Sequence, residues 1–376
     1  MIFHSFLNND LTRFVCKCTE FNLKVMDKIR KNVGDYNPPW WYNPHIGALI
    51  PLGKYHDLAF ETEILNYDDI HFPIHWYPFN PIKKKVEDVD GGIKIILYFP
   101  GHGQKITSNV IQSFSKVAAS KNFWVCVIGI RGMSVPLTSP KFTHPGLLDD
   151  AQAVLHHFKT HFHIPIYLFA AGFSAGTNLL QTTILHNNTG LQILGAVCVC
   201  CNVDYGKARD NIESTFIGRF YSWVLVSIFK DIVIQNSHMH KHFGGSAMLT
   251  AELDACSYIS EYDKKFASII HGFENDDDLC KRCSPLLNYT EFELPLLILQ
   301  SRDDPLHGDF IDENLCVDQL TTNKNIVYME TKYGNHFGYY EGSLFDAFSN
   351  NESYTYPAKV ATTLFDLIID DTIKTK

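Results

Sequence analysis

The feature that most constrains the fold is a regular alternation of short apolar runs with helical segments, which begins at Ile93. The apolar runs are IKIILYF, FWVCVIGI, IPIYLFAA, ILGAVCVCC, ELPLLILQ and NIVYMET, and the helices are expected near residues 108–120, 147–160 and 310–320, after residue 174 and from residue 357. Continuous apolar runs separated by helices are typical of a parallel sheet covered on both faces. The sequence therefore predicts an α/β fold with a mostly parallel, doubly wound sheet.

The alternation is interrupted between residues 207 and 290, where FIGRFYSWVLVSIF and later charged helical stretches intervene. We interpret this insertion as a helical cap over the carboxyl ends of the strands. Upstream of the alternation, HDLAFETEILNY and IHFPIHWYPF predict two adjacent strands. The predicted domains are an N-terminal arm (1–50), with one helix near 19–31, the first part of the core (51–206), the cap (207–290) and the second part of the core (291–376).

Composition and charge restrict the class of protein. With 376 residues, 45% of them hydrophobic and 19% charged, the chain can bury a large core and does not resemble a disordered protein. The net charge of -9 argues against binding to a phosphate backbone, so nucleic acid is excluded as a partner. No apolar run reaches the roughly 18 residues of a membrane span, and no signal peptide is recognisable. We expect a cytoplasmic protein, and the sequence leaves its oligomeric state open.

The ten cysteines are expected to be reduced, because the chain is long for a disulfide scaffold and lacks a secretory signal. Cys280 and Cys283 form a CxxC pair, but zinc binding would need a second pair at a matching spacing. The run CVCC lies in an apolar segment, where cysteine packs as a small hydrophobic residue. We therefore expect no metal ion and no organic cofactor.

Glycine-rich and polar stretches follow four of the predicted strands. PGHGQ follows IKIILYF, GFSAG follows IPIYLFAA, SRDDP follows ELPLLILQ, and GNHFG follows NIVYMETKY. The carboxyl ends of parallel strands meet at one edge of a sheet, where open α/β folds bind their ligands. A serine, an aspartate and a histidine thus occur in the chain order of the α/β-hydrolase catalytic triad.

The residue types match the roles of such a triad. Gly172 and Gly176 allow a tight strand-to-helix turn that would project Ser174 above the sheet as a nucleophile. A serine hydroxyl needs a base, which we assign to His336, and the imidazole needs a carboxylate that orients it and stabilises its positive charge. Asp304 is preferred for this role because it is the third residue after a small residue at the strand end.

Two questions remain open at this predicted site. Asp303 is the alternative acid, and the aspartate that is not used would be a solvated or turn-capping carboxylate. The oxyanion of a tetrahedral intermediate also needs donors, which we assign to the backbone N–H groups of Ala175, at the start of a helix, and His102 in PGHGQ. Arg131, which follows FWVCVIGI, is expected to orient the loops around the site.

Seven stretches of the chain resemble the YheT-like, embryogenesis-associated branch of the α/β hydrolases, which includes animal α/β-hydrolase-domain lipases, yeast medium-chain ester synthases and bacterial esterases. The stretches are PPWWYNPHIGALIP, LYFPGHGQ, IRGMSVPLTSPKFTHPGLLDDAQAVLHHF, LFAAGFSAGTNLL, SYISEYDKKFASIIHGFENDDDLCKRCSPL, LILQSRDDPLH and YGNHFGYYEG. The resemblance implies an α/β-hydrolase fold and a triad of Ser174, Asp304 and His336. It also implies hydrolysis of carboxylic esters, including monoacylglycerols and phospholipids, or transfer of acyl groups to alcohols.

The leading hypothesis is a serine esterase or lipase that acts on a small-molecule acyl ester or lipid through an acyl-enzyme. One alternative is an alcohol acyltransferase with the same triad, and another is a non-enzymatic ligand-binding protein with a hydrolase fold. The apolar segment FIGRFYSWVLVSIF is expected both to pack within the cap and to contact an acyl chain, and the sequence does not separate these two roles. Peripheral contact of the cap with a membrane is a further expectation from the same segment.

Overall fold

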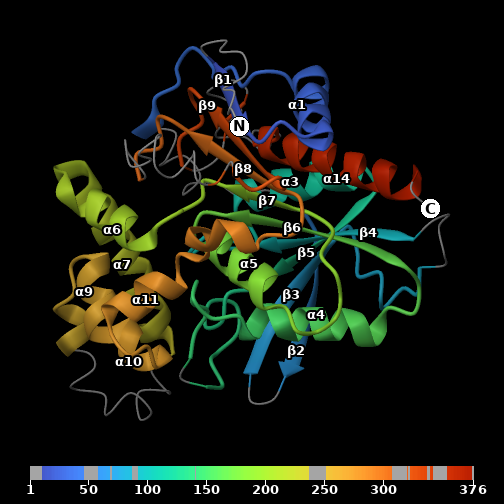
Figure 1. Ribbon diagram of the computed structural model, residues 1–376. Coiled ribbons are helices and arrows are strands. Elements are labelled where there is room, and N and C mark those ends of the chain that lie inside the picture. Colours follow the sequence, from blue (N-terminus) through green and yellow to red (C-terminus); the bar gives the residue numbers. More distant parts are fainter. Residues whose placement is uncertain are drawn as a thin grey trace.

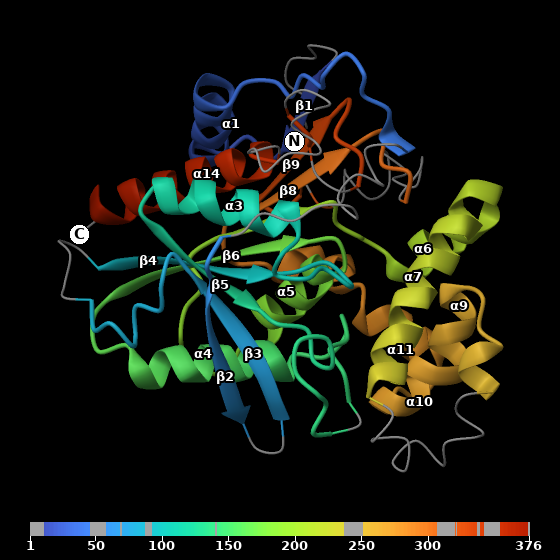
Figure 2. The same cartoon turned by 180° about the vertical axis from the view of Figure 1, so that it is seen from behind.

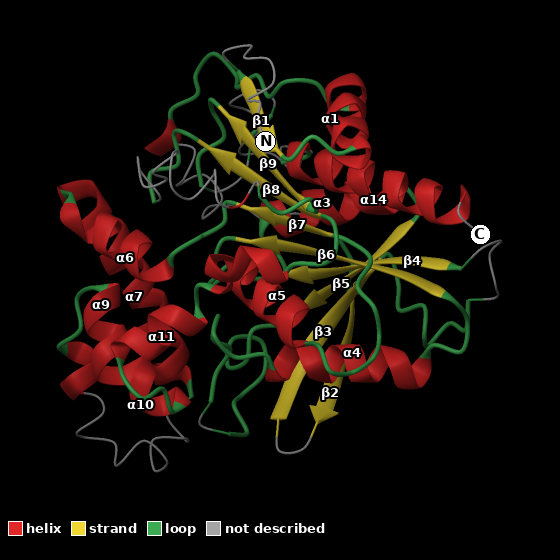
Figure 3. Ribbon diagram, viewed as in Figure 1, coloured by secondary structure: helices red, strands yellow, loops and turns green. Residues whose placement is uncertain are grey.

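A computed structural model describes residues 11–45, 58–67, 70–86, 92–139, 141–236, 251–306, 320, 322–336, 339–341 and 354–374. Within them a nine-stranded sheet forms the centre of the molecule, with helices on both faces (Figures 1 and 3). The strands are β1 (Thr12–Cys16), β2 (Glu61–Tyr67), β3 (Ile70–Tyr77), β4 (Ile93–Phe99), β5 (Phe123–Ile128), β6 (Ile166–Phe173), β7 (Ala196–Val199), β8 (Leu296–Ser301) and β9 (Ile326–Thr331).

The sheet order is β1-β9-β8-β7-β6-β4-β5-β3-β2. Strands β4 to β9 are the six predicted apolar runs, and every pairing among them is parallel. The strands β3 and β2 add an antiparallel ribbon at one edge, and β1 pairs antiparallel with β9 at the other. The predicted fold class, an α/β-hydrolase fold with a mostly parallel sheet, is confirmed.

The register of the parallel strands brings distant loops together. Phe99 at the end of β4 pairs with Gly172 of β6, so that PGHGQ lies beside GFSAG. In the same way Ser301 of β8 pairs with Thr331 of β9, which places SRDDP beside GNHFG. Because all four loops leave the same edge of the sheet, the side chains that they carry converge there.

Helices cover both faces of the sheet and bury two separate layers of core. They are α1 (Glu20–Asn32), α3 (Asn109–Ser120), α4 (Asp149–His161), α5 (Ala175–His186) and α14 (Tyr356–Lys374). One layer lies under α1, α3 and α14 and includes Val25, Phe114 and Phe365. The other lies under α4 and α5 and includes Val154 and Leu179. Continuous apolar strands are therefore required, since both faces exclude water.

A group of helices lies between β7 and β8 in the chain and beyond the carboxyl ends of the strands in space (Figure 2). It comprises α6 (Tyr205–Ser214), α7 (Phe216–Gln235), α9 (Ile259–Tyr262), a π-helical turn (Asp263–Ala267), α10 (Ser268–His271) and α11 (Asp276–Arg282). We call this group the cap. Its apolar side chains form their own cluster, which includes Val226, Tyr262 and Phe266. The 3-10 helix that follows the cap (Pro285–Glu291) packs against α5 of the core. No helix of the described residues is both long and apolar enough to cross a bilayer.

The N-terminal segment contains a strand that the sequence did not predict. The helix expected near 19–31 is α1, which begins directly after Thr19. The Thr19 side chain caps this helix by accepting a hydrogen bond from the Asn22 backbone. Strand β1 precedes it and pairs from Thr12 opposite Thr331 to Cys16 opposite Val327. Five residues carry too little pattern to predict a strand, and the partner lies more than 300 positions away. The helix expected at 310–320 lies outside the described residues, apart from Leu320.

Buried histidines make the stability of this fold depend on pH. His75 of β3 is buried, bonds to the Thr62 hydroxyl on β2 at 2.9 Å, and has its pKa lowered to about 4 by burial. The folded protein keeps this imidazole neutral, whereas the unfolded chain binds a proton below about pH 6.5, so stability is lost as the pH falls. We expect His75→Gln to reduce the difference in unfolding free energy between pH 7 and pH 5 by about 2 kcal/mol.

Urea denaturation at the two pH values measures this difference. The same substitution at exposed His161 is the control and should leave it unchanged. An equal pH dependence in wild type and His75→Gln would contradict the assignment.

Candidate active site

Ser174 occupies a strained turn between β6 and α5. Its backbone has φ 51° and ψ -127°, a conformation that side chains other than glycine rarely adopt. The turn is tight enough that a Cβ on Gly176 would lie 2.2 Å from the Phe99 carbonyl oxygen, and one on Gly172 would lie 2.9 Å from the Cα of Thr177. Glycine is therefore required at both positions, and the serine hydroxyl is held above the sheet edge.

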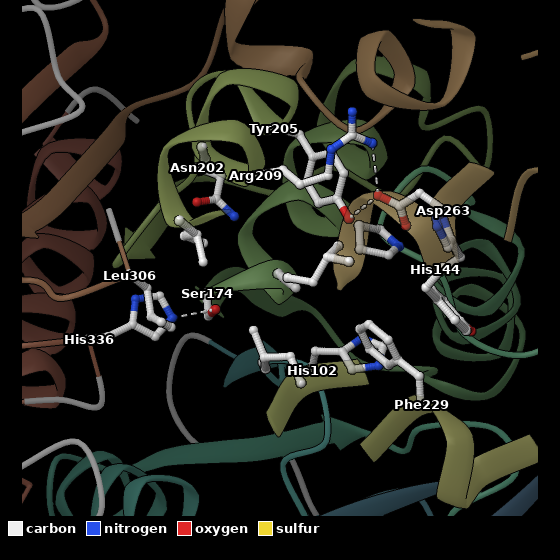
Figure 4. Close-up of a pocket in the computed structure, with 18 of the residues that line it drawn as sticks. His102, His144, Ser174, Asn202, Tyr205, Arg209, Phe229, Asp263, Leu306 and His336 are labelled. Carbon is white, nitrogen blue, oxygen red and sulfur yellow. Dashed lines mark hydrogen bonds and ion pairs between the residues drawn. The ribbon is translucent and has the colours of Figure 1, made fainter. Parts of the chain in front are cut away.

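The structure brings Ser174, His336 and Asp304 together in one hydrogen-bonded chain (Figure 4). His336 Nε2 lies 2.6 Å from Ser174 Oγ, and His336 Nδ1 lies 2.8 Å from Asp304 Oδ2. Asp304 is 1% exposed and His336 is 3% exposed, so water does not screen their interaction. The backbone N–H of Leu306 donates to the other oxygen of Asp304 at 2.8 Å and fixes the carboxylate. This is the arrangement in which a histidine activates a serine and a carboxylate orients the histidine.

Asp303, the alternative acid, has a different environment. It is half-buried; its Oδ2 accepts a hydrogen bond from the Tyr42 hydroxyl at 2.6 Å, and its Oδ1 accepts one from the Asn335 backbone at 2.9 Å. The Tyr42 hydroxyl also accepts a hydrogen bond from the Gly334 backbone at 3.1 Å. Asp303 is therefore not a solvated carboxylate. It ties the loop after β8 to the loop that carries His336.

Tyr42 is a site residue that sequence reasoning did not single out. It lies in NPPWWYNPH, which the sequence marked as irregular because of its prolines and as part of the family resemblance. A second tyrosine of the N-terminal segment, Tyr36, donates to the carbonyl of Tyr340 at 2.5 Å. The N-terminal segment thus supports the histidine loop from outside the sheet.

The predicted oxyanion donors lie beside the serine. Ala175 is the first residue of α5, so its N–H has no acceptor in a preceding helical turn. His102 lies in the PGHGQ loop, which is closed by hydrogen bonds between Gly101 and Gln104, and both Ala175 and His102 line the same cavity as Ser174. Burial and, to a lesser extent, the nearby His144 ring lower the pKa of the His102 imidazole to about 3. This ring is therefore neutral at physiological pH.

The cavity beside Ser174 is bounded by the core on one side and the cap on the other (Figure 4). Most of its wall is apolar, and the apolar lining residues are Phe142, Pro145, Phe173, Ala175, Ala208, Ile212, Leu225, Phe229, Ile259 and Leu306. Leu225 and Phe229 belong to α7, in the segment that was expected to contact an acyl chain. A mostly apolar cavity with a few polar groups is typical of small-molecule sites.

The cap contributes a buried polar cluster to the same cavity. Asp263 Oδ2 accepts hydrogen bonds from the Tyr205 hydroxyl at 3.0 Å and from Arg209 Nη1 at 3.1 Å. Arg209 also binds both carboxylate oxygens of Asp276, at 2.6 and 2.9 Å. Burial raises the pKa of Asp263 to about 7, although Arg209 acts in the opposite direction. None of these residues was predicted individually; Asp263 lies in EYDKKF, a stretch of the family resemblance.

Arg131, which was expected to orient the loops around the site, contacts residues on both sides of Phe142. It is 3% exposed, and its Nε lies 2.7 Å from Asp150 Oδ1. Its Nη1 donates to the carbonyl of Lys141, and its backbone N–H donates to the Thr143 hydroxyl. These contacts hold the loop that presents Phe142 to the cavity.

One group of side chains in the described part of the chain has metal-ligating potential. The ligand atoms of Cys200, Asp304 and His336 lie within 4.8 Å of one another. Asp304 and His336 bind each other, however, and burial raises the pKa of Cys200 well above 9, so that it is a neutral thiol. Burial likewise raises the pKa of Cys280 to about 12 and that of Cys283 well above its ordinary value. Both cysteine environments thus disfavour the thiolate that a metal ion binds.

No family model matches the chain. It is 24% identical over 335 residues to abhydrolase domain-containing protein 2 of Drosophila melanogaster, covering 82% of this chain and 79% of that protein. It is 25% identical over 258 residues to monoacylglycerol lipase ABHD2 of Danio rerio, and 23% identical over 252 residues to phospholipase ABHD3 of Homo sapiens. These two matches cover 65% and 66% of this chain, but only 58% and 59% of the relatives.

A solved structure of an arylesterase superposes with a TM-score of 0.50 at 13% identity, over 93% of this chain and 98% of that chain. The likeness concerns the fold. The chain therefore has the α/β-hydrolase fold. The proteins that it resembles in sequence are named as α/β-hydrolase-domain proteins.

The contacts of the two aspartates predict different effects of the same substitution. Asp304→Asn removes the charge that orients His336, so we expect the rate at which a fluorophosphonate probe labels Ser174 to fall by about 10⁴. Asp303→Asn loses only a supporting contact, and we expect a fall of less than about tenfold. Probe labelling followed by intact-mass spectrometry measures both rates. A larger loss in Asp303→Asn than in Asp304→Asn would reverse the assignment.

Proposed function

We propose that the protein is a serine hydrolase of carboxylic esters that acts on acyl esters of lipid type. The observation that carries this proposal is the chain Ser174–His336–Asp304, which opens into a mostly apolar cavity. Its relatives include proteins named monoacylglycerol lipase and phospholipase, which supports a lipid or ester substrate. The stretches quoted above support the finer assignment to the YheT-like branch of the α/β hydrolases.

In the proposed reaction Ser174 Oγ attacks the ester carbonyl while His336 Nε2 takes the hydroxyl proton. The Asp304 carboxylate stabilises the imidazolium that forms. The backbone N–H groups of Ala175 and His102 donate to the oxyanion of the tetrahedral intermediate. His336 then gives the proton to the leaving alcohol, and an acyl-enzyme on Ser174 remains. Water, deprotonated by His336, hydrolyses the acyl-enzyme and releases the carboxylic acid.

Replacing the nucleophile tests the proposal. We expect Ser174→Ala to lower kcat for p-nitrophenyl esters by at least about 10³ and to abolish fluorophosphonate labelling. Ser120→Ala, which changes an exposed serine on α3, is the matched control and should keep wild-type rates. In a series of acyl lengths, the apolar cavity predicts that kcat/KM rises from acetate to longer chains. Equal labelling of wild type and Ser174→Ala would refute the esterase mechanism, and activity on acetate alone would refute the lipid preference.

We also propose that the cap contacts lipid surfaces through an exposed patch on α7. The patch consists of Phe216, Ile217, Phe220 and Trp223, which are 90%, 49%, 49% and 53% exposed. Positions 216, 220 and 223 share one face of the helix, and the rings of Phe220 and Trp223 stack at 6.2 Å. Further along the same helix, Leu225 and Phe229 line the cavity, so docking would bring the site close to its substrate.

Removing the aromatic rings tests this contact. We expect the double substitution Phe220→Ser and Trp223→Ser to weaken binding to phosphatidylcholine vesicles by at least about tenfold, since each ring loses apolar burial. Hydrolysis of a water-soluble short-chain ester should not change. Ile373→Ser, at an exposed apolar position of α14, is the control for sedimentation with vesicles. Unaltered vesicle binding in the double variant would exclude the patch as the docking surface.

A further inference from the structure

The Asp263 carboxylate keeps one oxygen without a hydrogen-bond partner. Asp263 is 1% exposed and lines the same cavity as Ser174. Its Oδ2 accepts from Tyr205 and Arg209, but its Oδ1 receives no hydrogen bond from any described residue. Buried carboxylates normally satisfy both oxygens, because an unpaired one is costly. In Figure 4 the carboxylate lies across the cavity from Ser174. A ligand in the cavity can supply the missing donor.

A second acceptor on the cavity wall is also unpaired. The buried Oδ1 of Asn202 has no hydrogen-bond partner among the residues that the structure describes, and Asn202 lines the cavity with Ser174 and Asp263. Two unpaired acceptors require donors on the ligand, such as hydroxyl groups. Tyr262 Oη and His102 Nε2, which are unpaired as well, can each act as donor or acceptor according to the ligand.

The charge of the cavity disfavours an anionic ligand. Arg209 is the single arginine or lysine among the described residues that line it. Its charge is already compensated by Asp263 at 3.1 Å and Asp276 at 2.6 Å, and Asp210 lies 3.7 Å away. Two of the lining histidines, His102 and His144, do not add positive charge, since burial lowers the pKa of each to about 3. A phosphate would thus meet no uncompensated arginine or lysine among the described residues that line the cavity.

We propose that Asp263 determines substrate specificity by accepting a hydrogen bond from a hydroxyl group of the ester, so that the cavity selects neutral, hydroxyl-bearing esters over phosphorylated ones. The inference rests on the proposed ester hydrolysis and adds a recognition element to it. The reacting carbonyl lies at Ser174, while the remainder of the molecule reaches the cap. Asp263 is not a catalytic residue in this scheme, because it binds a part of the substrate that does not react.

Three esters with the same acyl chain test the proposal: 1-decanoylglycerol, propyl decanoate and 1-decanoylglycerol 3-phosphate. For wild type we expect kcat/KM for the glycerol ester to exceed that for each of the others by about tenfold or more. Asp263→Leu removes the acceptor, so kcat/KM for the glycerol ester should fall by about tenfold to a hundredfold, while that for the propyl ester stays within about twofold. The preference for the glycerol ester should therefore disappear.

Asp276→Asn is the matched control, because it weakens the other ion pair of Arg209 and changes a residue that does not line the cavity. It should keep the preference for the glycerol ester, and an equal loss in both variants would overturn the role of Asp263. If Asp263→Leu does not fold, as judged by its thermal unfolding, the wild-type ranking decides alone. Equal rates on the glycerol and propyl esters, or faster hydrolysis of the phosphate ester, would overturn this inference. Absence of any Ser174-dependent hydrolysis of the three esters would instead refute the proposed function.

Discussion

The close approach of β4, β6 and α5 at Ser174 is the constraint on which the site depends. Gly176 lies so near the carbonyl of Phe99 that α5 begins directly over the end of the neighbouring strand. The turn forces Ser174 to a positive φ and leaves its hydroxyl at the sheet edge. Because β4 pairs with β6, the same packing holds the PGHGQ loop beside the serine. Ser174 and the candidate oxyanion donors are thus positioned by backbone packing, with little dependence on flexible side chains.

The other half of the site is positioned from the opposite part of the sheet. His336 and Asp304 follow β9 and β8, and their loops are joined by Asp303, which accepts from Asn335. Tyr42 closes this arrangement from the N-terminal segment through its hydroxyl. The imidazole therefore has neighbours on both sides that limit its movement. Such supporting contacts decide whether a hydrogen-bonded chain between three loops keeps its geometry.

The cap supplies a large part of the cavity wall beside the serine. Its helices add most of the apolar wall and, in Asp263, Tyr205 and Arg209, the polar cluster at the wall of the cavity. A buried ion pair is a poor source of stability, because the desolvation of both charges offsets their attraction. A cluster with an unpaired carboxylate oxygen in a cavity is better understood through a ligand. In the proposed scheme the loops of the core carry the reacting groups, and the cap binds the part of the substrate that does not react.

The sequence alone determined the sheet, the tight turn at Ser174 and the order of the strand-end loops, because these follow from local apolar runs and from glycines that permit such a turn. It also favoured Asp304 over Asp303, but only the structure shows which of the two carboxylates reaches His336. Strand β1, the Tyr42 contact and the Asp263 cluster were decided by the tertiary structure. Each depends on contacts between residues far apart in the chain, whose energies come from pairing and burial that no short segment contains.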